Sequence, residues 1–272
     1  MSNTSNPEYT LFLWVKGAYP RRIVYQLLCS GLVASVADLN AGKVDHPNFH
    51  LNVITLTLED GSPVMRAADP NDPTPVGKSS PALRIRNTDT GSEEWIHESG
   101  SIAMFLAEQF PAKNPVVSSD PVKRAQALDS VQLNNLACQN LGTYISHALP
   151  AQITTYWSKL SEEDRSKGAG LNAKLHIANQ QAKLQDWAAA SLEKGGWLTP
   201  GIEGPGVVDC TVAGVLRYFW LGYEVDMLED ERLGPLRDWW KRFKSLPWWE
   251  ELEETGEVHP SFLRFPKDLR EW

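Results

Sequence analysis

Long apolar runs are missing from this sequence of 272 residues. No window approaches the roughly 18 consecutive apolar residues that a membrane-spanning helix needs. Hydrophobic residues make up 42% of the chain, which is typical of globular proteins. The first ten residues, MSNTSNPEYT, have neither the basic start nor the apolar stretch of a secretory signal. We therefore expect a cytoplasmic protein that makes no contact with membranes.

Cysteine and clustered positive charge are also scarce. The three cysteines, Cys29, Cys138 and Cys210, lie far apart without a CxxC motif, which argues against a disulfide framework or a zinc site. We expect them to be buried as small apolar residues. The six histidines show no metal-ligand spacing, so no metal is expected. The formal charge is −8 and basic clusters hardly exceed pairs, so nucleic acid is not an expected partner.

The first half of the chain alternates apolar runs with a helical pattern. YTLFLWV, residues 9–15, predicts a buried strand because it is apolar and aromatic. A helix is expected to begin near Pro20 and to end at Gly31. HLNVITLTL, residues 50–58, predicts a second strand, which the connecting helix would place parallel to the first.

Two further strands are expected after an irregular stretch. Residues 60–80 are rich in Asp, Pro and Gly, so they should be mostly loop with room for one short helix. PALRIRN and SEEWIH flank the turn NTDTGS, which indicates a β-hairpin. A helix follows from about Glu98. The expected order is therefore β-α-β-(α)-β-β-α.

A change of composition divides the chain. The stretch 112–120 has the proline, serine and asparagine content of a linker. We therefore expect an α/β domain over residues 1–111 and an all-helical domain with a C-terminal tail over residues 121–272.

Four helical segments are expected in the second half. Ser119 or Asp120 should cap the first of them, and the motif SEED, which begins at Ser161, should open the second. VVDCTVAGVLRYFWLGY is apolar nearly all round, which is typical of a central buried helix. The expected helical segments are 122–148, 161–193, 207–223 and 232–254. The second could be one helix or two, and the last is interrupted at Pro247.

The stretch WIHESGSIAMFLAEQF places an acid and a serine where a strand turns into an apolar helix. A helix N-terminus exposes unpaired N–H groups and the positive end of the helix dipole, so it suits a carboxylate ligand. Ser99 can add a hydroxyl donor, and Glu98 can receive an ammonium group. Together they could bind the α-carboxylate and α-amine of an amino acid. The alternative is a plain cap, with Ser99 at the N-cap and Glu98 solvated.

The run SSPALRIRNTDTGSEEWIHESGSIAMFLAEQFP resembles the N-terminal signature of the glutathione S-transferase family. The resemblance implies a thioredoxin-like α/β domain followed by an all-α domain. It also implies a cis proline at Pro81, a backbone contact from Ser80 to the cysteinyl part of glutathione, and binding of the γ-glutamyl end by Glu98 and Ser99. The likeness extends over residues 9–254.

The second half carries a weaker part of the same likeness. GVVDCTVAGVL is similar to the start of the family's buried helix, where a capping box has the pattern Thr/Ser-x-Ala-Asp. Asp209 fits the acid of that pattern, whereas Gly206 replaces the usual hydroxyl residue and Val208 the usual alanine. GPLRDWWKRFKSLPWWEEL resembles the final family helix.

One family residue is missing. In many members a Ser, Cys or Tyr just after the first strand donates a hydrogen bond to the glutathione sulfur, and here Gly17 occupies that position. Lys16, Tyr19 and Arg21 are close by, together with the N-terminus of the following helix, whose dipole lowers thiol pKa values. We therefore expect electrostatic activation of the thiol, with Lys16 and Tyr19 as catalytic candidates and Arg21 as a glutathione ligand. Lys16 as a solvated charge and Tyr19 as a packed ring remain alternatives.

Further site residues are expected around these. Lys43 and Lys78 are basic residues that could reach the glycine carboxylate of glutathione. A second, apolar substrate would lie in the cleft between the two domains. Asn135, Gln139 and Tyr144, on the first long helix of the second half, are candidates for orienting it.

Within the family, the chain resembles the long type found in fungal secondary-metabolite pathways, including glutathione-dependent trans/cis isomerases of pseurotin-like pathways. It implies a homodimer that uses glutathione and a small apolar electrophile. The thiolate would add to an activated olefin of a natural product. Either the adduct persists, or the C–C bond rotates and glutathione is released. Gly17 favours the reversible route, and it also leaves open a non-catalytic protein that binds glutathione or another protein.

Overall fold

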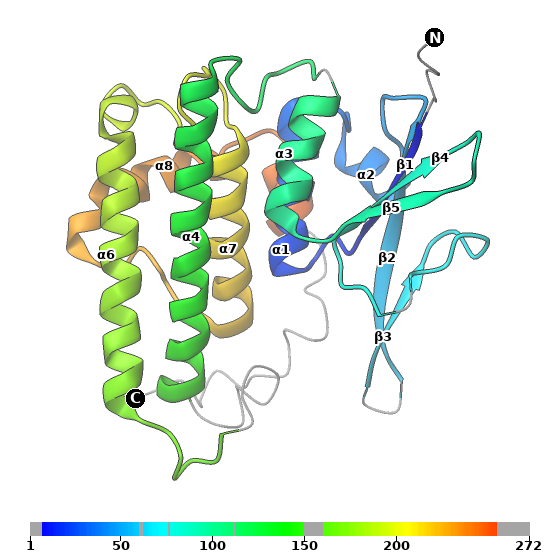
Figure 1. The fold of residues 1–272 in the computed structure, drawn as a ribbon. Helices are drawn as coiled ribbons and strands as arrows, with labels where there is room; N and C mark the ends of the chain where they lie inside the picture. The colour runs from blue at the N-terminus through cyan, green and yellow to red at the C-terminus, as the bar shows by residue number, and fades with distance from the viewer. Residues whose placement is uncertain (1–6, 60–61, 76, 111, 150–159, 255–272) are drawn as a thin grey trace.

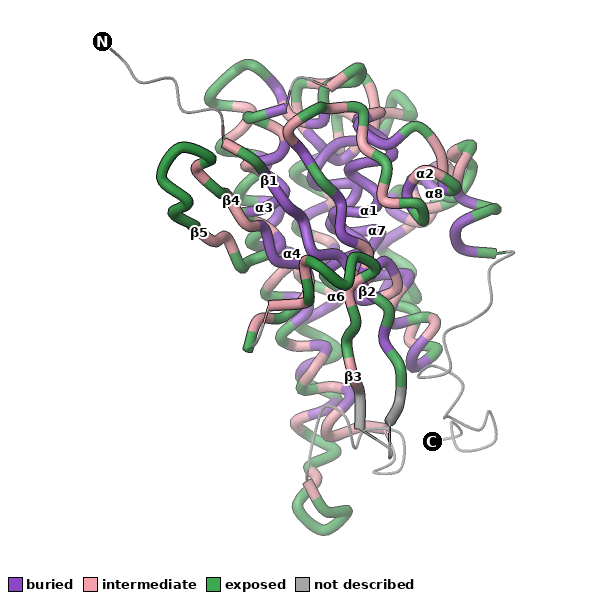
Figure 2. Tube along the Cα trace, turned by 90° about the vertical axis from the view of Figure 1, so that its right-hand side faces the viewer, coloured by how far each residue is buried: buried purple, intermediate pink, exposed green. Residues whose placement is uncertain are grey.

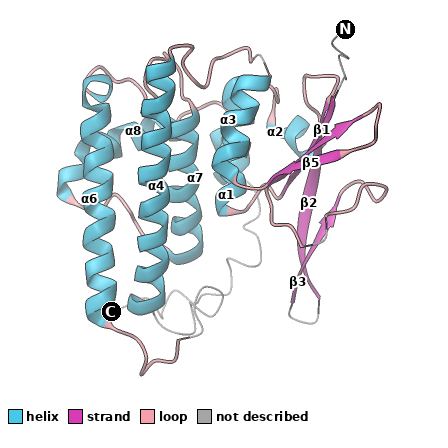
Figure 3. Cartoon of the chain, in the orientation of Figure 1, coloured by secondary structure: helices cyan, strands magenta, loops and turns pink. Residues whose placement is uncertain are grey.

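The computed structural model describes residues 7–59, 62–75, 77–110, 112–149 and 160–254. An α/β part and an all-helical part pack side by side (Figure 1), with strands confined to one side of the molecule (Figure 3). The α/β part consists of β1 (Pro7–Leu13), α1 (Ala18–Ser30), α2 (Val36–Asn40), β2 (Phe49–Glu59), β3 (Ser62–Ala67), β4 (Ala82–Asn87), β5 (Glu93–Ile96) and α3 (Ser99–Gln109). The helical part consists of α4 (Pro121–Ala148), α6 (Lys167–Leu192), α7 (Val207–Tyr223), η1 (Glu231–Leu233), α8 (Gly234–Lys244) and η2 (Glu250–Glu254).

The sheet has the strand order β3-β2-β1-β4-β5. β1 pairs with β2 in parallel, and all other pairs are antiparallel. The predicted β-α-β unit and the predicted hairpin are therefore confirmed. A small α/β part followed along the chain by an all-helical part is the glutathione transferase architecture.

The stretch after β2 differs from expectation. Its described residues form no helix; instead, β3 extends the sheet as an edge strand antiparallel to β2. The following loop is tied to the sheet by side chains. Arg84 forms an ion pair with Asp72 at 2.6 Å, and the Asn52 amide donates to the Asp72 carbonyl at 2.8 Å. These polar contacts between distant residues hold the loop on the sheet, and local composition cannot reveal them.

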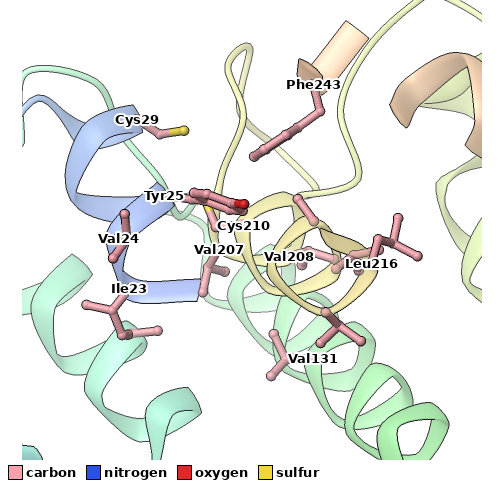
Figure 4. Packing of buried hydrophobic residues seen from close by; sticks show 14 of the residues in the cluster. Ile23, Val24, Tyr25, Cys29, Val131, Val207, Val208, Cys210, Leu216 and Phe243 are labelled. Carbon is pink, nitrogen blue, oxygen red and sulfur yellow. The ribbon is translucent and has the colours of Figure 1, made fainter. Parts of the chain in front are cut away.

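α1 and α7 join the two parts of the molecule. The tube in Figure 2 is buried along most of both helices, and Figure 4 shows Tyr25 of α1 beside Val207 and Cys210 of α7. A Cβ atom at Gly214 of α7 would lie 3.0 Å from the backbone nitrogen of Arg22, so this close approach requires glycine. One hydrophobic core therefore runs through both parts.

The start of α7 explains a departure from the family pattern. A Cβ atom at Gly206 would lie 2.5 Å from the carbonyl oxygen of Val116, which leaves no room for a serine or threonine. The Thr199 hydroxyl takes over the cap by accepting from the Val208 N–H at 3.0 Å. Asp209 completes the capping box by accepting from the Gly206 N–H at 2.9 Å.

The other helix ends agree with expectation except one. Asp120 caps α4 by accepting from the Val122 N–H at 2.8 Å. α6 begins later than predicted: Ser166 is its N-cap, and Ser161 forms only a turn in which its hydroxyl donates to Asp164 at 2.6 Å. The SEED motif thus makes a local contact that competes with a helix start. The tail predicted beyond Glu254 lies outside the described residues.

None of the described helices is both long and apolar enough to cross a membrane. The three cysteines are buried, as predicted, and none is in a disulfide.

Candidate functional site

The N-terminus of α1 has no room for the missing hydroxyl. Gly17 is the N-cap residue, and no side chain caps the helix there. A Cβ atom on Gly17 would lie 2.8 Å from the ring of Trp14 and 3.0 Å from the ring of Pro20. A serine or cysteine at this position would therefore require Trp14 to move. Activation of a thiol here must rely on groups other than residue 17.

Ser80 fastens the neighbouring loop to the end of β1. Its hydroxyl accepts from the Trp14 N–H at 2.7 Å and lies 3.4 Å from the Phe12 carbonyl. The Ser80–Pro81 peptide bond is cis, as the resemblance implies. Within the described ranges the backbone N–H and C=O of Ser80 make no hydrogen bond, so both are available to an extended ligand.

α3 begins with open polar groups. Glu98 is its N-cap residue, yet its side chain makes no capping hydrogen bond, and the first turn contains no acid. The Glu98 side chain is exposed, and Ser99 is 5% exposed. Among the residues that the structure describes, neither side chain has a hydrogen-bond or ion-pair partner. Ser99 is therefore not the N-cap, and the first N–H groups of α3 are not satisfied by a side chain.

Tyr19 lies at the first turn of α1 and is 44% exposed. The guanidinium carbon of Arg22 is 4.8 Å from the centre of its ring, a cation–π contact. Burial raises the pKa of the Tyr19 phenol; Cys138 and Glu98 raise it further, while Arg22 lowers it. The phenol therefore stays protonated near neutral pH and can donate a hydrogen bond.

Lys16 and Arg21 are turned toward η2. The Lys16 ammonium donates to the Leu252 carbonyl at 3.3 Å, and burial lowers its pKa while Glu253 raises it. Arg21 is 1% exposed and pairs with Glu253 at 2.9 Å. This pairing leaves no guanidinium surface for glutathione, so Arg21 is removed from the expected ligands.

The two lysines proposed for the glycine carboxylate lie apart. Lys78 is 4.8 Å from the Trp95 ring centre and 3.5 Å from His97, the residue that precedes Glu98. Lys43 is exposed, pairs with Asp38 of α2 at 3.8 Å, and follows the opposite end of α1. Because α1 has 13 residues, its ends are about 20 Å apart, which separates Lys43 from the other candidates.

α4 supplies part of the predicted acceptor side. The Asn135 side-chain oxygen accepts from Arg22 at 2.8 Å, and Gln139 is exposed one turn further on. Tyr144 is nine residues after Asn135, so it lies on the opposite side of the helix. There it lines a separate cavity with Lys174 and Tyr223, which removes it from the interdomain site.

Sequence reasoning missed Arg22. Its guanidinium also donates to the Cys138 sulfur at 3.4 Å, so it links α1 to α4 directly beneath Tyr19. The only signal in the sequence was the pair Arg21-Arg22 within an apolar helix. In the described part of the chain no cluster of three or more His, Cys, Asp or Glu side chains could hold a metal ion.

The whole fold matches solved glutathione transferases. A glutathione transferase family member from Pseudomonas fluorescens, with bound glutathione, has a TM-score of 0.57 at 20% identity, covering 92% of this chain and 100% of that chain. A Tau class glutathione S-transferase from mango has a TM-score of 0.54 at 19% identity, covering 94% and 96%. A maleylacetoacetate isomerase from Anaeromyxobacter dehalogenans has a TM-score of 0.57 at 15% identity, covering 96% and 98%. No protein-family model matches the sequence, and no curated relative was found.

Proposed function

We propose that this protein is a glutathione-dependent enzyme of the transferase fold. The supporting observation is the set of open polar groups beside the cis Pro81: the Ser80 backbone, the Glu98 carboxylate and the Ser99 hydroxyl. Glu98 would receive the γ-glutamyl ammonium, while Ser99 and the N-terminus of α3 would receive the α-carboxylate. The Ser80 backbone would pair with the cysteinyl residue. Lys78, two residues before Ser80, would approach the glycine carboxylate.

In this arrangement the glutathione sulfur would lie at the N-terminus of α1. The helix dipole there favours a thiolate over a thiol. The Tyr19 hydroxyl, which has no hydrogen-bond partner among the described residues, would donate to the sulfur. Lys16 is the second catalytic candidate, because it is only partly buried and lies between β1 and the N-terminus of α1.

The reaction that we propose is addition of the thiolate to an activated olefin of a natural-product intermediate, as in the long fungal enzymes that the sequence resembles. The acceptor would lie between the two domains, near Asn135 and Gln139 of α4. The adduct either persists or releases glutathione after rotation about the former double bond. The isomerase among the structural neighbours makes the second route relevant. We place the enzyme in the cytoplasm as a homodimer, with domains over residues 1–111 and 121–272.

Removing the γ-glutamyl ligands is expected to abolish glutathione binding. The Glu98→Ala, Ser99→Ala double variant loses an ion pair and a hydrogen bond to a charged group, each worth about 1.5–3 kcal/mol, so the affinity should fall at least about 100-fold. Calorimetric titration of glutathione measures this directly.

A matched double variant controls for a general loss of negative charge and hydroxyl groups. Glu94→Ala on β5 and Ser101→Ala on α3 remove two exposed side chains of the same kinds close by, and should leave the affinity unchanged. Wild-type protein that gives no heat with glutathione would remove the basis of this function.

A non-catalytic binding protein is the alternative, and Gly17 is its best support. Turnover of chlorodinitrobenzene and simple enones separates the two possibilities, with Lys16→Ala and Tyr19→Phe as variants. Glutathione binding without turnover of any electrophile would favour the non-catalytic protein. Labelled glutathione that appears stoichiometrically in the product would identify conjugation, and its absence from a rearranged product would identify isomerisation.

A further inference from the structure

Two adjacent arginines of α1 are both buried but differ in how their charges are balanced. Arg21 is 1% exposed and its guanidinium meets the Glu253 carboxylate. Arg22 is 2% exposed, and among the described residues its guanidinium donates hydrogen bonds only to neutral groups, the Asn135 amide oxygen at 2.8 Å and the Cys138 sulfur at 3.4 Å. No described carboxylate forms an ion pair with Arg22. Within the part of the chain that the structure describes, its positive charge is therefore buried without an ion-pair partner.

Such a charge is costly unless an anion joins it. Burying an ion away from water carries a penalty of several kcal/mol, which a counter-charge offsets. Other polar atoms nearby also lack partners in the described part of the chain: the Nε of Arg22, and both side-chain polar atoms of Asn134, which is 2% exposed. Asn134 is four residues before Cys138, so both lie on one side of α4. Among the described residues, the junction of α1 and α4 thus holds a cation without a carboxylate partner and an amide without hydrogen bonds.

The charge lies just beneath the proposed sulfur site. The ring of Tyr19 covers the Arg22 guanidinium. Tyr19 itself is partly exposed at the first turn of α1. The dipole of α1 adds positive potential of the same sign. The carboxylate of Glu98, the N-cap residue of α3, raises the pKa of Tyr19. Cys138, from α4, is a neutral thiol because burial raises its pKa.

We propose that Arg22 is the positioning residue that replaces the missing side chain at Gly17: it holds the Tyr19 ring and supplies the positive charge that keeps bound glutathione as a thiolate. The inference rests on the proposed function. The thiol loses its proton to solvent, the Tyr19 hydroxyl donates to the resulting sulfur anion, and Arg22 stabilises that anion through the ring. Asn135 and Cys138 fix the guanidinium without cancelling its charge, since both are neutral.

Asn135→Asp tests the charge without removing the hydrogen bond. The new carboxylate would pair with Arg22 and neutralise it, so the pKa of the bound glutathione thiol should rise by about one unit, with roughly tenfold less thiolate at neutral pH. Ultraviolet absorbance of the thiolate, followed against pH in the enzyme–glutathione complex, measures this shift. The melting temperature should stay equal or rise, because an ion pair replaces a contact between a buried cation and a neutral amide.

Three variants complete the test. Arg22→Met should give the same upward shift, and Arg22→Lys, which keeps the charge, should return the pKa toward the wild-type value. Gln132→Glu, which adds an exposed acid on α4 one turn from Asn135, should leave it unchanged. If Arg22→Met fails to fold, Asn135→Asp alone still decides the question.

The outcomes separate this inference from the proposed function. A folded Asn135→Asp variant that binds glutathione with an unchanged thiol pKa would overturn the role of Arg22 and leave the proposed function standing. S-methylglutathione cannot ionise at sulfur, so the Asn135→Asp substitution should not change its affinity. A tenfold loss of that affinity would indicate that Arg22 binds a carboxylate of glutathione, and it would also overturn the inference. Wild-type protein without any glutathione binding would overturn both.

Discussion

Replacing Glu253 by glutamine should lower the free energy of unfolding by about 3–5 kcal/mol, the cost of breaking a buried ion pair from one side. The Glu253 side chain is 2% exposed and meets Arg21 at 2.9 Å and Arg217 at 3.1 Å. The Tyr25 hydroxyl donates to the same carboxylate at 2.8 Å. A glutamine keeps one oxygen acceptor but removes the buried negative charge that faces the guanidinium groups of Arg21 and Arg217. Urea-induced unfolding gives the difference.

Glu254→Gln is the matched control. This neighbouring acid also pairs with Arg217, at 3.4 Å, but its side chain is 48% exposed. Exposed ion pairs contribute at most about 1 kcal/mol, so the control should unfold nearly as the wild type does. Equal losses in the two variants would show that the buried carboxylate has no special role.

The same carboxylate predicts a dependence of stability on pH. Burial alone would raise the pKa of Glu253, but the guanidinium groups of Arg21 and Arg217 outweigh it and lower the pKa below its ordinary value. The stabilisation is therefore complete above the unfolded-state pKa of about 4.3 and is lost as the pH falls through the lower folded-state value. Glu253→Gln should flatten this acid-side decline, which unfolding curves between about pH 5 and pH 3 can measure.

Asp209→Ala is expected to prevent stable folding. Its fully buried carboxylate accepts from the N–H groups of Leu198, Thr199 and Gly206, from the Thr199 hydroxyl, and from the indole of Trp239 at 2.7 Å. Each buried donor that loses its partner costs about 1–3 kcal/mol, so the sum approaches the whole stability of an ordinary domain, about 5–15 kcal/mol. Soluble yield and thermal unfolding are the measurements.

Milder variants keep this prediction testable if Asp209→Ala cannot be purified. Thr199→Ala removes the hydroxyl that caps α7 and should cost about 1–2 kcal/mol, whereas Thr199→Ser should restore most of it. Asp226→Ala is the control for an exposed acid that accepts from a single N–H, that of Leu228 at 2.8 Å. An Asp209 variant as stable as this control would contradict the buried network.

The sequence predicted those parts of the fold in which the apolar pattern decides the structure. Periodicity and stop signals predicted the parallel β1–β2 pair, the end of α1 at Gly31, the β4–β5 hairpin and α7. The sequence did not predict the short helix α2, and the prediction failed at β3 and at Ser161. In both places short polar segments could form several local structures, and distant contacts such as Arg84 with Asp72 select one.

The candidate site was predicted less completely. The order of the motifs predicted Ser80 and Pro81 at the start of one strand and Glu98 and Ser99 at the start of the following helix. It could not tell Arg21 from Arg22, because neighbouring residues on a helix point in directions about 100° apart and their partners lie far along the chain. Glu253 belongs to the acidic run EELEE, which by itself predicts a solvent-exposed surface. Only the folded structure shows that Glu253 contacts α1.

The ion pair between Arg21 and Glu253 joins residues 232 positions apart, almost the full length of the chain. During synthesis Glu253 emerges 232 residues after Arg21, when the sheet and α3, α4, α6, α7 and α8 have already been made. Until η2 has been made, Arg21 lacks this counter-charge, even after α7 is available to pack on α1. The two halves are separate in sequence, but they become stable together.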